Sequence, residues 1–173
     1  RQFRQVKILK DNQEIINKSS TVILGVTPSV GNRIIPKLKF PRNKKIISLI
    51  STINIEKLKK LTKNKNIVRA TPLPPIEINK GPIILCPPNK SAKFFFKHLG
   101  LVIEVKTEKL SYKFWATASI MASFYELLNI SSSWLIKKGI NKKNSDDYIS
   151  ELFLSLSQDA VNKKSQGFKK IVA

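Results

Sequence analysis

The chain has 173 residues, with 32 Lys and Arg against 11 Asp and Glu, a formal net charge of +21 and a hydrophobic share of 42%. That length fits one ordinary domain or two small ones, and the apolar share argues against wholesale disorder. A single cysteine, Cys86, excludes a disulfide framework and a multi-cysteine zinc site, and a single histidine, His98, excludes most histidine metal cages. We therefore predict no metal centre.

Short apolar runs divide the first half of the chain into predicted strands. All nine prolines lie between Pro28 and Pro88, so this half is punctuated by turns while the second half is free to form long helices. The runs predict strands of a buried sheet, the first of them buried on both faces. In chain order they cover residues 21–26, 46–51, 66–70, 82–86 and 101–105, and residues 6–9 also resemble a strand.

Amphipathic stretches between these runs predict helices with polar caps. Asn12 is a cap candidate for a short helix before the first strand, and Asn54 caps a helix over residues 55–61. Ser91 can cap a helix over residues 92–99. Strands that alternate with helices predict an α/β fold class with a largely parallel sheet.

From Thr107 the hydrophobic period changes to three and four residues, which predicts helices. The first is about five turns long or more. A second is predicted to begin at Ser131 or Ser132 and to end at Gly139, and a third to begin at Ser145. Their apolar faces are large for a small helical piece, so we expect helix packing against a second subunit.

The positive charge is spread along the chain. Basic clusters lie at residues 57–60, 63–65, 163–164 and 169–170, mostly as lysines among Asn and Ile, a composition that a biased genome writes on any fold. Aromatic residues do not alternate with these clusters as stacking platforms for nucleic acid do, and no ribonucleoprotein motif or zinc finger is present. We expect no nucleic-acid partner, and an anionic cofactor or substrate uses part of the charge.

Three further sequence signals are missing. No apolar run reaches the roughly 18 residues of a membrane span and no apolar signal core opens the sequence, so we expect no membrane partner and a cytoplasmic location. No Gly-x-Gly-x-x-Gly loop, which brings backbone N–H groups to the pyrophosphate of a dinucleotide, is present either. Either the fold binds no dinucleotide, or the chain begins after that segment.

Five stretches carry recognisable patterns, in order along nearly the whole chain. They are residues 12–28 (NQEIINKSSTVILGVTP), 46–61, 68–75 (VRATPLPP), 95–105 (ending HLGLVIEV) and 115–125. They resemble successive motifs of the pyrroline-5-carboxylate reductases. Those motifs are N-x-E-x-x-x-x-S-D-V-x-x-L-A-V-K-P, the next strand with its T-I-x-x-L helix, V-R-A-M-P-N-T-P, F-x-x-x-G-x-x-x-x-V and T-A-L-S-G-S-G-P-A-Y.

The resemblance implies an enzyme, an oxidoreductase that transfers a hydride from NADP or NAD in reduced form to a cyclic imine to give proline. It implies a Rossmann-like NAD(P)-binding domain with a parallel sheet over residues 1–105, lacking its N-terminal part. It implies an all-α dimerisation domain over residues 106–173, lacking its C-terminal part. We therefore expect a small-molecule imine substrate and a homodimer or higher homo-oligomer formed through the helical domain.

The resemblance also implies roles for single residues. The residues that it places against the cofactor are Asn12 at the adenosine end, Val26, Thr27 and Pro28 after one strand, and Leu49, Ile50 and Ser51 on the nicotinamide side. Ser119 matches the serine before the family's Gly-Ser-Gly and is the one candidate for a catalytic role; the catalytic group is otherwise unknown.

The chain departs from the family pattern at several positions. Thr27 stands for a lysine, Leu73-Pro74 for an Asn-Thr pair, and residues 120–123 for Gly-Ser-Gly-Pro. Ile and Met at the last place favour a continuous helix. The glycine-rich loop of the family would fall before residue 1, and its substrate-binding S-P-G-G-T segment beyond residue 173. We expect a fragment of a longer enzyme that does not turn over by itself.

Plainer interpretations stand beside these. Asn12 caps a helix in most sequences, and a serine in mid-helix, as predicted for Ser119, is more often a packing residue. Tyr125 is expected in the core, and Cys86 as a small buried hydrophobe, because no base partner is evident. A related imine or keto-acid reductase, a non-catalytic nucleotide-binding relative and a basic nucleic-acid-binding protein are the alternative functions.

Overall fold

The computed structural model describes residues 3–171, which fall into two compact units, Arg1–Ala116 and Thr117–Ala173. The division between the compact units lies after Ala116, whereas the predicted domain boundary lies after residue 105. The reason is an ion pair: the carboxylate of Glu108 lies 2.8 Å from the guanidinium of Arg69 in the sheet. The helix that begins at Glu108 therefore belongs to the first unit.

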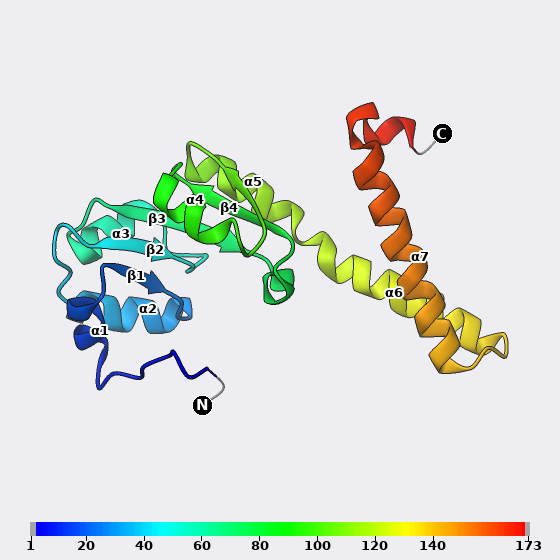
Figure 1. Ribbon diagram of the computed structural model, residues 1–173, viewed down its shortest axis with the longest axis horizontal. Helices are drawn as coiled ribbons and strands as arrows, with labels where there is room; N and C mark the ends of the chain where they lie inside the picture. Colours follow the sequence, from blue (N-terminus) through cyan, green and yellow to red (C-terminus); the bar gives the residue numbers. More distant parts are fainter. Residues whose placement is uncertain (1–2, 172–173) are drawn as a thin grey trace. The chain divides into compact units, whose positions relative to one another are not determined.

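A five-stranded sheet in the order β1-β2-β3-β4-β5 forms the first unit (Figure 1). Neighbours β1–β2, β2–β3 and β4–β5 are parallel, and β3–β4 is antiparallel. The strands are β1 (Thr21–Leu24), β2 (Lys45–Ser48), β3 (Ile67–Pro72), β4 (Pro82–Cys86) and β5 (Leu101–Glu104). The α/β class with a mostly parallel sheet is confirmed.

The reversal at β4 was not predicted, and it follows from the length of the preceding connection. Only residues 73–81 link β3 to β4, and most of them form a 3-10 helix, η2 (Pro74–Ile78). A parallel crossover needs a dozen or more residues, so the chain turns back instead. Gly81 takes a φ of +89°, and a Cβ on Gly100 would lie 2.4 Å from the carbonyl oxygen of Gly81. The two glycines thus let β4 and β5 begin in close contact.

Helices cover the two faces of this sheet unequally. They are α1 (Asn12–Lys18), α2 (Pro28–Ile34) with η1 (Ile35–Lys37), α3 (Ile55–Thr62), α4 (Lys90–Phe96) and α5 (Glu108–Thr117). One apolar cluster joins Ile16 of α1, Ile35 of η1 and Leu58 of α3 to the first face. A second cluster joins Ala92 and Phe96 of α4 to the other face.

Three details of the first half differ from the prediction. Residues 6–9 form no strand and are largely exposed. Asp11, and not Asn12, caps α1, because its Oδ1 accepts a hydrogen bond of 2.8 Å from the N–H of Glu14. β1 is not buried on both faces: it is one of the two edge strands of the described sheet, and the side chain of Ile23 is 44% exposed.

Asparagine caps set the starts of α3 and α4. Asn54 caps α3 as predicted, accepting a hydrogen bond of 2.7 Å from the N–H of Lys57. α4 begins earlier than predicted because Asn89, and not Ser91, caps it, accepting from the N–H of Ala92 at 2.9 Å. Serine and asparagine are equally good caps. Local sequence therefore does not distinguish these two candidates.

The second unit is a pair of long helices lying side by side, α6 (Ile120–Lys137) and α7 (Lys142–Lys163), followed by η3 (Lys164–Gln166) and η4 (Phe168–Lys170). The single long helix predicted from Thr107 is wrong, because a turn at residues 118–119 separates α5 from α6. The expectation that Ile120 and Met121 favour a continuous helix is therefore not met, because α6 begins at Ile120.

The predicted helix starts at Ser131 or Ser132 and at Ser145 are also wrong. Ser132 is buried within α6 and donates a hydrogen bond of 2.6 Å to the carboxylate of Asp146 on α7. Together with the ammonium group of Lys142, which has the larger effect, this bond lowers the pKa of Asp146. α7 starts at Lys142 because Asn141 caps it, accepting from the N–H of residue 144 at 2.9 Å.

The buried side chain of Asn64 joins the loop before β2 to the loop before β3 at the amino end of the sheet. Its amide group donates to the carbonyl oxygens of Pro41 and Lys44 at 2.8 and 2.9 Å, and its Oδ1 accepts from the N–H of Asn66 at 2.7 Å. Asn64 is 1% exposed, so water cannot replace these partners. It therefore fixes the entries into β2 and β3 together.

We expect Asn64→Ala to lower the free energy of unfolding by about 3 kcal/mol, because it leaves several buried backbone groups without partners. Urea unfolding followed by circular dichroism measures this loss. Asn43→Ala, which replaces an exposed asparagine in the loop before β2 that Asn64 contacts, is the control and is expected to change stability by less than about 0.5 kcal/mol. Equal stabilities of the two variants would contradict the role of Asn64.

Candidate functional site

The carboxyl ends of β1 and β2 bring two of the predicted cofactor segments together. These segments contain Val26, Thr27 and Pro28 after β1 and Leu49, Ile50 and Ser51 after β2. The N–H of Leu49 donates to the carbonyl of Leu24 at 3.0 Å, so the two segments leave the sheet side by side. The carboxyl ends of neighbouring parallel strands are the usual ligand edge of an α/β sheet.

Helix α2 lies against the segment that follows β2. A Cβ built on Gly31 would come within 3.0 Å of Ile50 and 3.3 Å of Ile53, so glycine permits this close approach. The sequence reasoning missed both α2 and Gly31. The available signal was Pro28 after Thr27, because proline is favoured at the first position of a helix.

A buried ion pair, also missed, holds the loop after β2. Arg69 lies opposite Ser48 in the β2–β3 register and is 2% exposed. Its guanidinium donates to the carbonyl of Ser51 at 2.6 Å and to the carbonyl of Ile53. Its Nε lies 2.8 Å from Oε1 of Glu108, an ion pair without the alignment of a hydrogen bond. An arginine inside an apolar strand was the signal, since buried arginines require partners.

Glu108 binds the same loop from the other side. Its Oε2 accepts a hydrogen bond of 3.0 Å from the N–H of Ile55, the first residue of α3. The ring of Tyr112, one turn along α5, lies 5.6 Å from the guanidinium carbon of Arg69. Cationic, anionic and aromatic groups therefore converge beneath residues 51–55.

The remaining contribution to this edge comes from the segment after β3, which is apolar. Leu73 and Pro74 follow β3 directly, and Pro74 begins η2. The hydroxyl groups that this edge offers among the described residues include those of Thr27 and Ser51, with the Oγ1 of Thr27 3.3 Å from the Oγ of Ser29. Such an edge can bind and orient ligands through backbone groups and hydroxyls.

Asn12 lies apart from the other predicted cofactor residues. It is exposed at the start of α1, next to Gln13, whose side-chain amide exchanges hydrogen bonds of 2.8 and 2.9 Å with the backbone of Lys39. Lys39 belongs to the segment that enters the amino end of β2. The structure therefore places Asn12 toward the end of the sheet opposite Val26.

The residues singled out in the helical region lie on its surface. Ser119 is exposed in the turn before α6, not in mid-helix, and its side chain does not cap that helix. Tyr125 is 59% exposed, so the expectation of a core position is wrong. The reason is that α6 contacts α7 along one side only, and two helices cannot bury all of its apolar residues.

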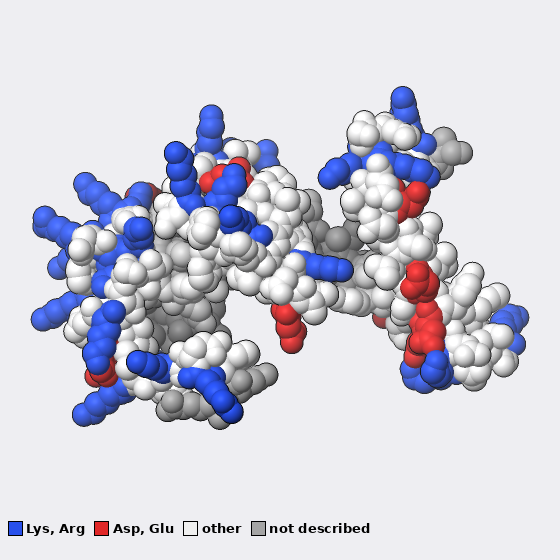
Figure 2. All heavy atoms as spheres, in the orientation of Figure 1, with Lys and Arg blue, Asp and Glu red and all other residues white. Residues whose placement is uncertain are grey.

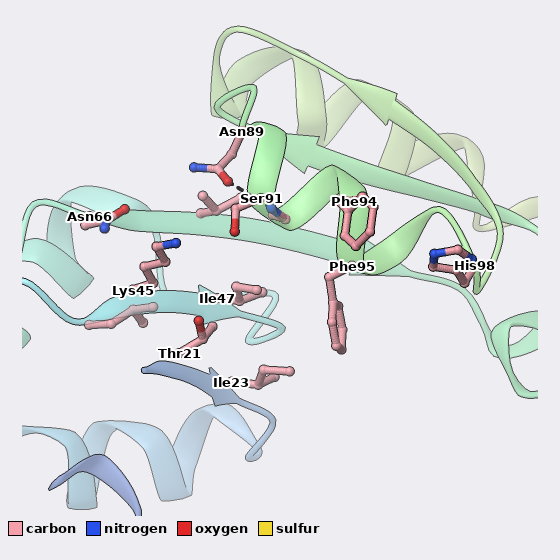
Figure 3. A pocket seen from close by; sticks show the side chains of 13 residues that line it. Thr21, Ile23, Lys45, Ile47, Asn66, Asn89, Ser91, Phe94, Phe95 and His98 are labelled. Carbon is pink, nitrogen blue, oxygen red and sulfur yellow. Dashed lines mark hydrogen bonds between the residues drawn. The ribbon is translucent and has the colours of Figure 1, made fainter. Parts of the chain in front are cut away.

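A cavity of about 580 Å³ lies on the open sheet face, away from this edge (Figure 3). Ile23 and Ile47 project into it from β1 and β2, and Phe94 and Phe95 project from α4. Thr21, Lys45, Asn66 and His98 are among its other lining residues. Its walls are mainly apolar and it faces the amino ends of the strands, so we interpret it as an uncovered part of the sheet and not as the reaction site.

Cys86 is buried at the end of β4, as expected for a small hydrophobe. Burial raises the pKa of its thiol, and the nearby carboxylate of Glu108 raises it further, while Arg69 has the smaller, opposing effect. A raised pKa keeps the sulfur protonated at neutral pH, which disfavours a nucleophilic role.

We expect the thiol of Cys86 to react with iodoacetamide at pH 8 at least about tenfold more slowly in the folded chain than in urea, because both protonation and burial suppress attack. Mass spectrometry of the alkylated protein over time gives both rates. Alkylation of the folded chain at the rate of the unfolded one would contradict this environment.

Figure 2 shows Lys and Arg side chains spread around the visible face of the α/β unit, with a few acidic residues among them. Within residues 3–171, no helix is long and apolar enough to cross a membrane, and no group of three His, Cys, Asp or Glu residues could hold a metal ion.

Comparison with known proteins agrees with the motifs. No protein-family model matches the chain. A pyrroline-5-carboxylate reductase from Synechocystis sp. is 30% identical over 110 residues, 58% of this chain and 41% of that protein. The structure of the 1-pyrroline-5-carboxylate reductase from Streptococcus pyogenes matches with a TM-score of 0.82 and 20% identity, over 94% of this chain and 65% of that one. This chain has the pyrroline-5-carboxylate reductase fold.

A second reductase structure, the Plasmodium falciparum enzyme with NADP bound, matches with a TM-score of 0.80 at 20% identity, over 94% of this chain and 65% of that one. The resemblance to pyrroline-5-carboxylate reductases found in the motifs is thereby confirmed. The chain spans less than half of the curated relative and just under two thirds of these reductase structures.

Proposed function

We propose that this protein is an NAD(P)H-dependent oxidoreductase that reduces a cyclic imine, (S)-1-pyrroline-5-carboxylate, to proline. The observation that carries the proposal is the meeting of the segments after β1 and β2 at one sheet edge, in a chain with the reductase fold. Reduced nicotinamide cofactor supplies the hydride in such chemistry, so the protein has to position two ligands and exclude water. A cytoplasmic enzyme of amino-acid biosynthesis fits this activity.

In this proposal, Val26, Thr27 and Pro28 line the cofactor from β1, and Leu49, Ile50 and Ser51 line its nicotinamide side. NADP and NAD are both candidate cofactors. Asn12, the first residue of α1, is the one residue of the set that lies away from this edge. Ser119 remains a candidate hydroxyl near the substrate.

The open edge of β1 supports a dinucleotide-binding domain that extends beyond these residues. Among residues 3–171, β1 pairs with β2 alone, and the exposed Ile23 lies next to the apolar cavity beside α4. Parallel sheets are normally buried on both faces. We infer that further strand and helix, from the same gene, complete the sheet there, and that catalysis requires them.

Proposed contact between two copies of the chain rests on the apolar surface of α6 and α7. Exposed large hydrophobic residues on these helices include Tyr125, Leu127, Ile130, Trp134, Leu154 and Leu156. Monomeric proteins seldom expose apolar patches of this kind. We infer that a second copy covers them, which makes a homodimer or a larger homo-oligomer.

We expect Leu154→Glu to shift the protein from dimer to monomer, because a carboxylate in an apolar interface loses its hydration without gaining a partner. Size-exclusion chromatography with light scattering measures the mass, and circular dichroism checks that α7 still folds. A monomeric unmodified protein at micromolar concentration would rule the interface out.

For the activity, we expect the protein expressed from its complete gene to oxidise NADPH in the presence of pyrroline-5-carboxylate. Thr27→Asp should raise the KM for NADPH by about tenfold, because a screened like-charge contact with an anionic cofactor costs about 1.4 kcal/mol. Aspartate is a good helix cap, so α2 should tolerate the change.

Ser20→Asp is the matched control, because it adds the same charge next to the opposite end of β1 at an exposed position. It should leave the KM unchanged. No NADPH oxidation above background by the unmodified protein would refute the proposed substrate, and equal effects of the two substitutions would refute the placement of the cofactor.

A second candidate is a reductase for a related imine or a 2-keto acid. Leu73 and Pro74 favour it, because they place apolar groups where the similar enzymes carry an Asn-Thr pair. A panel of cyclic imines and 2-keto acids tested with NADH and NADPH separates the two candidates. Faster turnover of any of them than of pyrroline-5-carboxylate would favour the second.

A further inference from the structure

We propose that Arg69 and Glu108 are positioning residues for the cofactor: their buried ion pair sets the conformation of residues 51–55 and so the shape of the nicotinamide side of the site. This inference rests on the function proposed above and adds two residues that touch neither cofactor nor substrate. The ion pair lies beneath the carboxyl ends of β1 and β2, where the ligands are proposed to bind.

The contacts of the pair are concentrated on one short segment. Arg69 donates to the carbonyls of Ser51 and Ile53, and Glu108 accepts from the N–H of Ile55. Three backbone groups within five residues are therefore bound by one ion pair. Ser51 is itself one of the residues expected to line the nicotinamide, so its main chain is held directly by Arg69.

Burial of Arg69 and Glu108 limits the conformations that residues 51–55 can adopt. The side chain of Arg69 is 3% exposed and that of Glu108 is 18% exposed, so neither exchanges its partners freely for water. Arginine offers a planar fork of donors that reaches two carbonyls and a carboxylate at once, which the single ammonium group of lysine cannot do. The segment therefore has one favoured conformation before any ligand binds.

Packing from α2 restrains the same segment from another side. Gly31 lies against Ile50 and Ile53, and a Cβ at this position would come within 3.0 and 3.3 Å of their side chains, which is closer than an ordinary van der Waals contact. The segment after β2 is thus fixed by side-chain packing at Ile50 and Ile53 and by polar contacts at Ser51, Ile53 and Ile55. Preorganised binding segments of this kind reduce the ordering cost of ligand binding.

The chain contains a matched control for the ion pair. Glu104 of β5 pairs with Lys93 of α4 at 2.8 Å, and its other oxygen accepts from the N–H of Asn89 at 2.9 Å, just before α4. Glu104 and Glu108 therefore make the same two kinds of contact: each pairs with a basic side chain and accepts a hydrogen bond from a backbone N–H at the start of a helix. Asn89 and its helix start lie beside the cavity on the open face and not at the ligand edge.

The test compares Glu108→Gln, Arg69→Lys and Glu104→Gln in the protein expressed from its complete gene. NADPH binding is measured by fluorescence titration, and hydrogen exchange of the peptides covering residues 49–57 is measured by mass spectrometry. We expect the first two variants to raise the Kd for NADPH by about tenfold, equivalent to about 1.4 kcal/mol, and to speed exchange in these peptides. Glu104→Gln should change neither quantity.

Comparing the change in KM with the change in kcat distinguishes a positioning role of the ion pair from a general loss of structure. We expect KM for NADPH to rise more than kcat falls, with Glu108→Asp recovering part of the affinity. An unchanged Kd in folded Glu108→Gln and Arg69→Lys would overturn the inference, and so would an equal loss in Glu104→Gln. If the protein binds NADPH but does not reduce pyrroline-5-carboxylate, the proposed substrate fails while these Kd values still decide the role of the pair. Failure of the unmodified protein to bind NADPH would overturn both.

Discussion

The α/β unit depends on satisfying the backbone groups in the loops before β2 and β3 and in the loop after β2. Both strands are buried, so the carbonyls and N–H groups in the adjoining loops are partly cut off from water and need protein partners. Asn64 supplies them at the amino end and Arg69 with Glu108 at the carboxyl end. Asn64 thereby joins the loops before β2 and β3, and Arg69 with Glu108 joins the loop after β2 to β3 and α5.

This constraint explains why the sheet can present a defined edge. The apolar runs of the sequence place β1, β2 and β3 side by side, but they do not decide how the loops after these strands are shaped. That shape comes from the carbonyl contacts of Arg69 and from the packing of Gly31 against Ile50 and Ile53. A binding function at this edge therefore depends on residues whose side chains face the interior.

Sequence patterns predicted the strands well because burial on a sheet requires short apolar runs, and residues 82–86 are an example that the structure reproduces residue for residue. The resemblance to the reductases, and not the pattern itself, implied the seven cofactor candidates, and six of them lie at one edge because the segments after parallel neighbours β1 and β2 leave the sheet side by side. Other features depend on tertiary contacts. Local propensity could not choose between Asn89 and Ser91 as a cap, and it favoured one continuous helix where α5 and α6 are separate. Arg69 has no partner within its own strand, and its role depends on Glu108, far along the chain.

The reversal of β4 has a consequence for how this fold can be altered. Since β4 runs back toward the amino ends of β1, β2 and β3, the exposed Pro87-Pro88 turn that follows it opens away from the ligand edge. The length and composition of this turn are therefore not constrained by ligand binding, as those of the loops after β1 and β2 are. Ligand recognition and the Pro87-Pro88 turn therefore lie at opposite ends of the strands. A peptide or tag inserted at this turn would leave the loops after β1 and β2 unchanged.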